Sequence, residues 1–542
     1  MTGGTLSAVS NRPDPMRPRS VPARSLSGLV SLLGLSEQGQ PIRGMVTGVT
    51  HDSRRVMPGD LYAALPGSRF HGAVFAEQAA AAGAAGILTD REGRIRAELA
   101  GLPVLVVDDP RAVLGEVASW VYGRPVRDLA LLGVTGTSGK STTTFLLEAG
   151  LRAAGHETGL IGGIEIRVAG EALPSALTTP EATDVHALFA LMRERGVTAA
   201  AMEVSSHALD LGRVGGAFFE VALFTNLSQE HLDYHGTMED YFAVKATLFT
   251  PELSRLGVVN VDDSWGRRLT HIAKVPVTTF SADGDPGADW RAADVRLEPY
   301  GSTFRVIGPG GVEAEARVPL PGPFNVANAL GAIVALVEAG ISLPVAVRGI
   351  ASLPGVPGRL EPVDEGQEFT VLVDYAHKPG AVEAVLGTLR PLTKGRLTIV
   401  LGCGGDRDRS KRPIMGEIAA RRSDVAVFTN DNPRSEDPWV VLNAMVGGVL
   451  TVPEDERAHV VVEPDRAAAI ALAIGRARRG DVVLVAGKGH EQGQYIAGEV
   501  LPFDDREVVR RALRERRTGT AGDAKDTATD TAAGNAADEE QS

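Results

Sequence analysis

The segment from Leu129 to Thr143 joins an apolar run to a glycine-rich turn that ends in a lysine and hydroxyl residues. Such a turn between a strand and a helix can point backbone N–H groups at a polyphosphate, and the helix N-terminus adds a favourable dipole. Lys140 would reach the β- and γ-phosphates, and the hydroxyl after it would ligate Mg²⁺. Val134 stands where the common pattern has glycine, so an ordinary glycine-rich turn is the competing interpretation. The segment therefore predicts ATP or GTP binding.

Carboxylate and imidazole groups follow two further apolar runs in the middle of the chain. Glu203 follows the run over 197–202, and a carboxylate at such a strand end is the expected second contact of Mg²⁺ in a phosphate-transfer site. A capping or core role is the alternative for this carboxylate. His231 and His235 lie in the sequence N-L-S-Q-E-H-L-D-Y-H, although isolated histidines are more often structural or exposed.

The last third of the chain repeats one pattern, an apolar run that ends in a polar loop. The runs cover 369–373, 397–401, 425–428, 460–462 and 482–485. In open α/β sheets the ligand crevice lies beyond the carboxyl ends of the strands. A solvated loop rim would explain any one ionisable residue there, but not the whole set. The set comprises Asp374, His377, Lys378, Asp406, Arg407, Asp431, Arg434, Lys488, His490 and Glu491.

The elements that must position these residues follow an alternating pattern. Short Val/Ile/Leu runs alternate with Ala/Leu/Glu/Arg-rich segments, which is typical of parallel α/β sheets. The pattern predicts strands over 85–88, 104–107, 219–224 and 257–261, helices over 110–121 and 142–154, and a β-rich stretch over 275–318. In the helix after the glycine-rich turn, we expect Leu146 and Leu151 to face the core, and Glu148 and Arg152 to face solvent.

Length and composition divide the chain into three α/β blocks between two polar tails. The 542 residues suffice for about three or four domains. We expect a first domain over 25–127, a central domain over 128–355 and a C-terminal domain over 356–514. Residues 1–24 are rich in Pro, Arg and Ser, and residues 515–542 consist mainly of Ala, Thr, Gly and acidic residues. Both tails are therefore expected to be disordered.

The overall composition excludes several classes of protein. The formal net charge of −13 disfavours a nucleic-acid-binding protein, since phosphate backbones are met by basic patches. No apolar window is long enough for a membrane span, and no secretory signal is visible. The single cysteine, Cys403, excludes an intrachain disulfide and fits a reducing cytoplasm. We expect a cytoplasmic protein that acts on small molecules.

Together these motifs resemble the Mur ligase family, the ATP-dependent amide-forming enzymes of peptidoglycan precursor synthesis. The resemblance covers about residues 25–512, and its motifs are distributed over all three blocks. It implies a UDP-substrate-binding α/β domain, a central P-loop ATPase-like domain with a parallel sheet, and a Rossmann-like C-terminal domain that binds an amino acid. The family's loop normally lacks glycine at the place of Val134, so this departure is a family trait.

The resemblance implies an ATP site built from the glycine-rich loop and from more distant segments. Lys245 matches a lysine that the family converts with CO₂ to a carbamate, which, unlike an ammonium, can ligate Mg²⁺. The implied metal ligands are Ser141, Glu203 and the carbamate of Lys245, and the implied catalytic residues are Lys140, Lys245, Glu203, His231 and Arg359. The ATP-binding residues are Gly136, Thr137, Ser138, Gly139, Lys140, Ser141, Thr142, Asn325, Asn328, Arg359 and Asp374.

The resemblance also implies contacts to a UDP-muramoyl-dipeptide. Ser53, in H-D-S-R-R-V, matches a residue that contacts the uridine moiety. Two threonines of L-T-T-P-E match contacts to the muramoyl-peptide, as do a serine and an arginine of E-V-S-S-H-A-L-D-L-G-R. These four residues are Thr178, Thr179, Ser205 and Arg213. Leu177 stands where relatives often have asparagine.

The motif D-N-P-R at 431–434 indicates which amino acid is added. In family members that use meso-diaminopimelate, the arginine of this motif, here Arg434, contacts the carboxylate of the distal stereocentre, which lysine lacks. A guanidinium matches a carboxylate with two parallel hydrogen bonds, and such a site rejects an analogue without the group. An exposed loop arginine is the alternative interpretation. The implied pocket comprises Arg407, Asp431, Asn432, Pro433, Arg434, Gly487 and Glu491, with Glu491 suited to the distal ammonium.

The implied reaction adds meso-diaminopimelate to UDP-MurNAc-L-Ala-D-Glu through an acyl phosphate, with ATP and Mg²⁺ as cofactors. A sibling that adds L-lysine and a ligase similar to folylpolyglutamate synthetase are the alternatives, and H-D-S-R-R-V and D-N-P-R argue against the latter. A nucleotide-controlled switch is a third hypothesis, but a switch would not need a polar pocket in a separate domain. We expect a monomer that neither binds nucleic acid nor inserts into a membrane.

Overall fold

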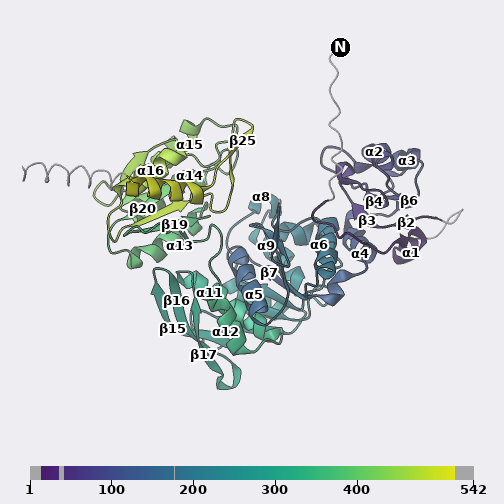
Figure 1. Ribbon diagram of the computed structural model, residues 1–542, viewed down its shortest axis with the longest axis horizontal. Helices are drawn as coiled ribbons and strands as arrows, with labels where there is room; N and C mark the ends of the chain where they lie inside the picture. The colour runs from purple at the N-terminus through teal and green to yellow at the C-terminus, as the bar shows by residue number, and fades with distance from the viewer. Residues whose placement is uncertain (1–13, 36–41, 176, 519–542) are drawn as a thin grey trace, which may run out of the picture. The chain divides into compact units, whose positions relative to one another are not determined.

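The computed structural model describes residues 14–35, 42–175 and 177–518 (Figure 1). The chain divides into two compact units. The first runs to Asp294 and includes Phe304–Arg317 and Val326–Leu353, and the second contains Val295–Thr303, Val318–Asn325 and the chain from Pro354. Each unit contains a largely parallel sheet with helices, so the expected α/β class is confirmed. None of the helices in these described ranges is long and apolar enough to cross a membrane.

The first sheet is four-stranded, parallel and ordered β3-β4-β5-β6. The helix expected over 110–121 begins and ends at those residues, because Asp109 accepts hydrogen bonds from two N–H groups of its first turn and proline follows at the first helical position. The elements of this region are β1 (Arg24–Ser25), α1 (Leu26–Leu32), β2 (Met45–Val46), β3 (Gly48–Thr50), β4 (Asp60–Ala63), α2 (Ala76–Ala81), β5 (Gly86–Thr89), α3 (Arg94–Leu99), β6 (Val104–Val106) and α4 (Pro110–Val121).

The second sheet has eleven strands in the order β10-β9-β8-β11-β7-β12-β13-β14-β15-β16-β17. Strands β11, β7 and β12 are parallel neighbours, so their carboxyl ends meet at one edge. The β-rich stretch expected over 275–318 is the run β14 to β17. The strands are β7 (Ala130–Thr135), β8 (Thr158–Ile161), β9 (Ile166–Val168), β10 (Glu171–Leu173), β11 (Ala199–Glu203), β12 (Val221–Phe224), β13 (Gly257–Asn260), β14 (Val277–Ser281), β15 (Trp290–Glu298), β16 (Gly301–Ile307) and β17 (Glu313–Val318).

Helix α6 connects the cores of these two sheets. Its larger apolar side chains, such as Leu188 and Phe189, pack in the core of the eleven-stranded sheet, whereas Ala187 and Ala190 pack with the four-stranded sheet and α4. The helices of this region are α5 (Lys140–Ala153), α6 (Ala182–Glu194), α7 (Ser206–Asp210), α8 (Leu232–His235), α9 (Met238–Ala246), α10 (Ser264–Ile272), α11 (Pro323–Glu338) and α12 (Leu343–Ala351).

One side chain of α5 lies on the opposite side from our expectation. Glu148, expected to face solvent, is buried, with 2% of its side chain exposed. It forms ion pairs of 2.9 Å with Arg152 and 2.5 Å with Arg167, the latter from strand β9. A carboxylate can be buried when it is paired in this way, and a partner on another strand is not visible in helical periodicity.

The sheet of the second unit is ordered β18-β19-β23-β20-β21-β22, with only β18 antiparallel. Because β23 lies between β19 and β20, the loop after β23 emerges between the loops that follow those strands. The elements are β18 (Glu361–Pro362), β19 (Thr370–Asp374), α13 (Pro379–Leu389), β20 (Leu397–Leu401), α14 (Lys411–Arg422), β21 (Val425–Phe428), α15 (Pro438–Val449), β22 (His459–Val462), α16 (Arg466–Arg476), β23 (Val482–Ala486), β24 (Gly493–Ile496) and β25 (Glu499–Pro502).

Alternating side chains bury both faces of this sheet. Leu397 and Ile399 of β20 pack with α13, α14 and α15, whereas Val400 packs on the other face with α16 and the C-terminal residues Val509 and Leu513. A parallel sheet covered on both faces leaves its strand ends as the accessible positions for polar side chains. The second unit therefore presents its polar loops where a ligand can bind.

Candidate active site

The glycine-rich loop connects β7 to α5 in a conformation that requires its glycines. Gly136 and Gly139 have φ values of +142° and +89°, which glycine adopts without the strain that a Cβ introduces. A Cβ at Gly136 would collide with Thr225 Oγ1, and one at Gly139 would collide with Asn328 Oδ1. Val134 is fully buried inside β7, where the chain is extended. A side chain at that position therefore does not disturb the loop.

Two lysines converge on the backbone of this loop. Lys140 Nζ donates to the carbonyl oxygens of Gly136 and Thr137, both at 3.0 Å. Lys245 Nζ, from α9, donates to the same Gly136 oxygen at 2.9 Å and lies 4.8 Å from the centre of the Tyr241 ring. Lys245 is only 1% exposed, so it is not the surface lysine that its sequence context alone suggests. The two ammonium groups therefore share one backbone acceptor, the carbonyl oxygen of Gly136.

Glu203 lies at the carboxyl end of β11, beside the strand that leads into the loop. Its Cα pairs with that of Val134, and its carboxylate, which is buried, accepts a hydrogen bond of 3.0 Å from Gly163 N. No cluster of three His, Cys, Asp or Glu side chains suited to a metal occurs among the described residues. A magnesium ion here would therefore need other oxygens besides this carboxylate. A hydroxyl at Ser141, a carbamate at Lys245 and nucleotide oxygens fit that need.

Three of the four residues expected to contact the muramoyl-peptide, all except Thr178, form one hydrogen-bonded group. Thr179 Oγ1 donates to the carbonyl oxygen of Glu203 at 2.8 Å and accepts from Ser205 N at 3.1 Å. Arg213 donates to the Thr179 carbonyl oxygen at 3.2 Å and forms an ion pair of 2.8 Å with Glu181. The chain therefore holds Thr179, Ser205 and Arg213 next to the strand end that carries Glu203.

His231 belongs to a cluster of aromatic and imidazole rings. Its ring centre lies 4.8 Å from that of His207 and 6.3 Å from that of Tyr241, and its Nε2 lies 3.1 Å from Glu230 Oε1. Burial lowers the pKa of the neighbouring His207 and His235, which keeps both neutral at pH 7. The ring cluster thus lies beside Tyr241, whose ring contacts Lys245.

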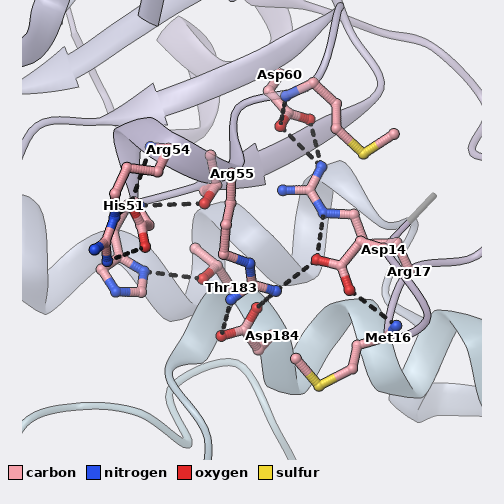
Figure 2. Close-up of polar contacts among 12 residues, drawn as sticks. Asp14, Met16, Arg17, His51, Arg54, Arg55, Asp60, Thr183 and Asp184 are labelled. Carbon is pink, nitrogen blue, oxygen red and sulfur yellow. Dashed lines mark hydrogen bonds and ion pairs between the residues drawn. The ribbon is translucent and has the colours of Figure 1, made fainter. Parts of the chain in front are cut away.

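The H-D-S-R-R-V segment joins the first sheet to α6 through side chains (Figure 2). Arg55 forms ion pairs of 2.6 Å with Asp14 and 3.0 Å with Asp184, and His51 Nδ1 lies within hydrogen-bonding distance of Thr183 Oγ1, at 3.2 Å. Ser53 itself begins a short 3-10 helix and is partly exposed. Its neighbours are thus fixed by structural contacts, and its own hydroxyl donates a long hydrogen bond of 3.4 Å to Gln78 Oε1.

Residues 14–24 were expected to be part of a disordered leader, but they pack against other segments of the first unit. Arg17 donates to both oxygens of the Asp60 carboxylate, at 2.9 and 2.8 Å (Figure 2). The backbone N–H groups of Arg19 and Ser20 donate to Glu194 Oε2 at the end of α6. The expectation failed because composition does not reveal partners as distant in sequence as Asp60 and Glu194. Residues 515–518 of the expected disordered tail are helical instead, and Arg516 donates to the Ala477 carbonyl oxygen at 2.7 Å. Residues 1–13 and the tail from residue 519 lie outside the described residues.

In the second unit, Asp374 and Arg359 lie close together at the end of β19. The buried Asp374 carboxylate accepts hydrogen bonds from the N–H groups of Leu360 and Ala376, both at 2.7 Å. Burial raises its pKa, and the charge of Arg359 opposes that rise. The Arg359 guanidinium lies 4.6 Å from the centre of the Tyr375 ring. A carboxylate and a guanidinium are therefore both available at this strand end.

The loops after β21 and β23 carry the residues expected to bind the amino acid, apart from Arg407. Asn432 Nδ2 donates to Glu491 Oε2 at 3.0 Å. Gly487 lies close to the Asp431 carboxylate, since a Cβ at this glycine would be 3.2 Å from Asp431 Oδ2. Arg434 has a positive φ of 54° and donates to the Gly405 carbonyl oxygen at 2.6 Å. The arrangement offers a guanidinium and two carboxylates within one group of loops, which suits a ligand that carries both an ammonium and a carboxylate.

Three domain families match consecutive parts of this chain. The Mur ligase family catalytic domain matches residues 45–122, the Mur ligase middle domain matches 134–336, and the Mur ligase glutamate ligase domain matches 358–489. The chain belongs to the Mur ligase family. Its predicted membership and fold are therefore confirmed.

Relatives of this Mur ligase match it over most of its length. A UDP-N-acetylmuramoyl-L-alanyl-D-glutamate–2,6-diaminopimelate ligase of Streptomyces coelicolor is 60% identical over 93% of this chain and 99% of its own. A solved structure with the same protein name has a TM-score of 0.66 and 32% identity, and covers 90% of this chain and 99% of its own. Folylpolyglutamate synthase of Mycobacterium tuberculosis, solved with ADP and AMPPCP, has a TM-score of 0.56 at 20% identity and covers 70% of this chain and 93% of its own. The last likeness shows a shared fold alone.

Each unit of this Mur ligase brings together some of the expected residues. Asn328 lies beside the glycine-rich loop, where a Cβ at Gly139 would meet its Oδ1. The same Oδ1 accepts a long hydrogen bond of 3.4 Å from Thr143 Oγ1 of α5. Asn325 belongs to the second unit, where its Nδ2 donates to the Pro321 carbonyl oxygen at 2.8 Å. Arg407 is exposed and takes no part in the hydrogen-bonded group around Asn432. The roles assigned to all these residues remain predictions.

The motif-based prediction did not include two residues that hold the glycine-rich loop. Thr225 Oγ1 donates to the Ser138 carbonyl oxygen at 2.7 Å, and Asn226 Oδ1 accepts from Ser138 N at 3.0 Å. Both follow β12, the strand next to β7. Their position directly after an apolar run was the available signal, because parallel neighbouring strands end at the same edge.

Proposed function

We propose that this Mur ligase adds meso-diaminopimelate to UDP-MurNAc-L-Ala-D-Glu at the expense of ATP. The observation that carries the proposal is the pocket at the ends of β21 and β23, where Arg434 of D-N-P-R lies in the same loops as Asn432 and Glu491. A guanidinium there matches the distal carboxylate of diaminopimelate, and Glu491 matches its distal ammonium. The name printed for the 60% identical relative agrees with this substrate.

The nucleotide chemistry is assigned to the glycine-rich loop and to Arg359. The dipeptide carboxylate attacks the γ-phosphate and forms an acyl phosphate and ADP. The neutral amine of the amino acid then attacks the acyl carbon, phosphate leaves, and an amide forms. Lys140, together with Arg359, stabilises the negative charge that spreads over the transferring phosphoryl group. Lys140 must exchange its two carbonyl contacts for phosphate oxygens to do so.

The oxygen ligands near the loop are assigned to magnesium. Glu203, Ser141 and the carbamate form of Lys245 would hold the ion, which neutralises phosphate charge when bound. CO₂ adds to the neutral amine of a lysine with loss of one proton, and the product is an anion. The burial of Lys245 beside Tyr241 supports a role inside the site. Thr178, Thr179, Ser205, Arg213 and Ser53 are assigned to the UDP-linked substrate.

The proposed substrates also suggest where and in what form the protein acts. ATP and UDP-linked precursors are cytoplasmic metabolites, and the single buried cysteine suits a reducing compartment. We infer a cytoplasmic enzyme that works as a monomer. Neither nucleic acid nor membrane insertion is needed for the proposed reaction.

Substrate-dependent phosphate release tests this proposal. Purified protein is assayed with ATP, Mg²⁺ and either UDP-MurNAc-L-Ala-D-Glu, meso-diaminopimelate, or both. We expect steady phosphate release only when both are present, because the acyl phosphate needs the first substrate and its turnover needs the second. Release that requires a folate substrate instead, or that needs no amino acid, would contradict the proposal.

A further inference from the structure

We infer that Lys488 is a positioning residue of the amino-acid pocket, where its buried ammonium orients Asn432 and balances the charge of the two carboxylates beside it. The inference rests on the proposed function of the same pocket. It adds a residue that contacts side chains of the pocket and was not itself expected to bind the amino acid. Lys488 lies in the loop after β23, within the sequence A-G-K-G-H-E.

The ammonium of Lys488 contacts three residues that are expected to bind the amino acid. Its side chain is 0% exposed. Nζ donates to Asn432 Oδ1 at 2.9 Å and to Glu491 Oε2 at 3.2 Å, and it lies 3.6 Å from Asp431 Oδ1. An ammonium has three N–H donors and no acceptor. Each of the three donors therefore faces a different residue of the pocket.

These contacts fix the orientation of the Asn432 amide. Oδ1 accepts from Lys488 Nζ at 2.9 Å and from Tyr495 N at 3.1 Å, so both of its neighbours are donors. Nδ2 donates to Glu491 Oε2 at 3.0 Å. A flipped amide would place an NH₂ group against two donors, which is unfavourable. Lys488 thereby keeps an N–H of Asn432 on the side of Glu491, whose side chain is 31% exposed and can reach a ligand.

Lys488 also balances charge around Asp431. Burial raises the pKa of this carboxyl, and Arg466 and Lys488 act against the rise. Among the described residues, Asp431 Oδ1 has no hydrogen-bond donor, so the ion pair with Lys488 is its compensating contact. The titratable groups that interact with Asp431 are Arg466, Lys488, Glu491, Asp505, Lys411 and Cys403.

A separate contact holds the backbone of the two loops, so loss of Lys488 need not unfold them. Arg466 is fully buried and forms two hydrogen bonds of 2.7 Å with Asp505. It also donates to the carbonyl oxygen of Ala486 at 2.9 Å and to that of Asn430 at 3.4 Å. These residues directly precede Gly487 and Asp431. Arg466 therefore holds the backbone of both loops through hydrogen bonds, whereas Lys488 contacts the side chains of Asn432 and Glu491.

Steady-state kinetics of the full-length enzyme test the inference with Lys488→Met, which keeps the apolar stem and removes the charge. We expect the KM for meso-diaminopimelate to rise about tenfold or more, because the groups that orient it are displaced. The KM values for ATP and for the UDP-linked substrate should stay unchanged. Loss of the cation raises the pKa of Asp431 further, so the acid limb of kcat/KM for the amino acid should move to higher pH.

Two further variants separate positioning from a loss of folding. Lys488→Gln retains a donor for Asn432 but no charge, so it should recover part of the KM and still show the shifted acid limb. Lys394→Met, at an exposed lysine of the same unit, should behave as wild type. A Lys488→Met enzyme with an unchanged KM and acid limb, or with equal losses for all three substrates, overturns the inference alone. A wild-type enzyme without amino-acid-dependent turnover overturns the proposed function, and the inference with it.

Discussion

The loop that is expected to bind ATP and the pocket that is expected to bind the amino acid hold their charged groups in different ways. At the loop, the ammonium groups of Lys140 and Lys245 donate to backbone carbonyl oxygens of residues 136 and 137. In the pocket, Lys488 and Asn432 bond to side chains that are themselves candidates for substrate contact.

This difference indicates what each region needs when its ligand arrives. A phosphate chain brings many oxygens, so Lys140, which is held by neutral carbonyls, can exchange those contacts for stronger, charge-assisted ones. An amino acid brings few groups in a fixed arrangement, so its pocket must have the partner side chains already oriented. The glycine-rich loop therefore depends on backbone shape, whereas the pocket depends on a network of side chains.

The largest effect is expected at Lys140. In Lys140→Met, kcat should fall by about 10²–10³-fold, the usual cost of removing one charged donor from a transition state. The ammonium that stabilises the transferring phosphoryl group is lost, while the pocket of the second unit is untouched. Phosphate release at saturating substrates measures the change. Lys274→Met, at an exposed lysine of the same unit, is the matched control, and turnover by Lys140→Met at the level of that control would refute the role.

A smaller effect is expected from a single methyl group in each region. Gly136→Ala places a Cβ against Thr225 Oγ1 at a φ of +142°, and Gly487→Ala places one 3.2 Å from Asp431 Oδ2 at a φ of +114°. Positive φ alone costs an alanine about 1–2 kcal/mol. We expect Gly136→Ala to raise the KM for ATP and Gly487→Ala to raise that for diaminopimelate, each by about tenfold. If either variant raised the KM values for ATP and diaminopimelate equally, the two regions would not bind different substrates.

Local patterns predicted the fold and the glycine-rich loop well. The loop is a continuous segment whose glycines, lysine and flanking strand and helix are encoded next to one another. The strand expected over 397–401 and that over 425–428 are observed at those residues, because a strand buried on both faces reads as an uninterrupted apolar run. Such features need no knowledge of distant partners.

Features that depend on distant partners were not predictable in the same way. Glu148 was expected to be exposed to solvent, but its ion pair with Arg167 of strand β9 allows its burial. Residues 14–20 were expected to be disordered, but their partners lie at Asp60 and Glu194. Lys488 was only one of ten ionisable residues at strand ends until its contact with Asn432 was known. In each case a side chain pairs across a large sequence separation, which periodicity and composition do not encode.

The most direct test of the whole account is the substrate preference of the enzyme with and without Arg434. The kcat/KM values for meso-diaminopimelate and L-lysine are compared in the wild type and in Arg434→Met, with the KM for ATP measured alongside. Hydrogen bonds to charged groups contribute about 1.5–3 kcal/mol, so we expect the wild type to prefer diaminopimelate by about tenfold to a hundredfold or more, and the variant to lose most of that preference. The KM for ATP should remain unchanged. A wild type that uses L-lysine equally well, or a variant that keeps its preference, would contradict the account.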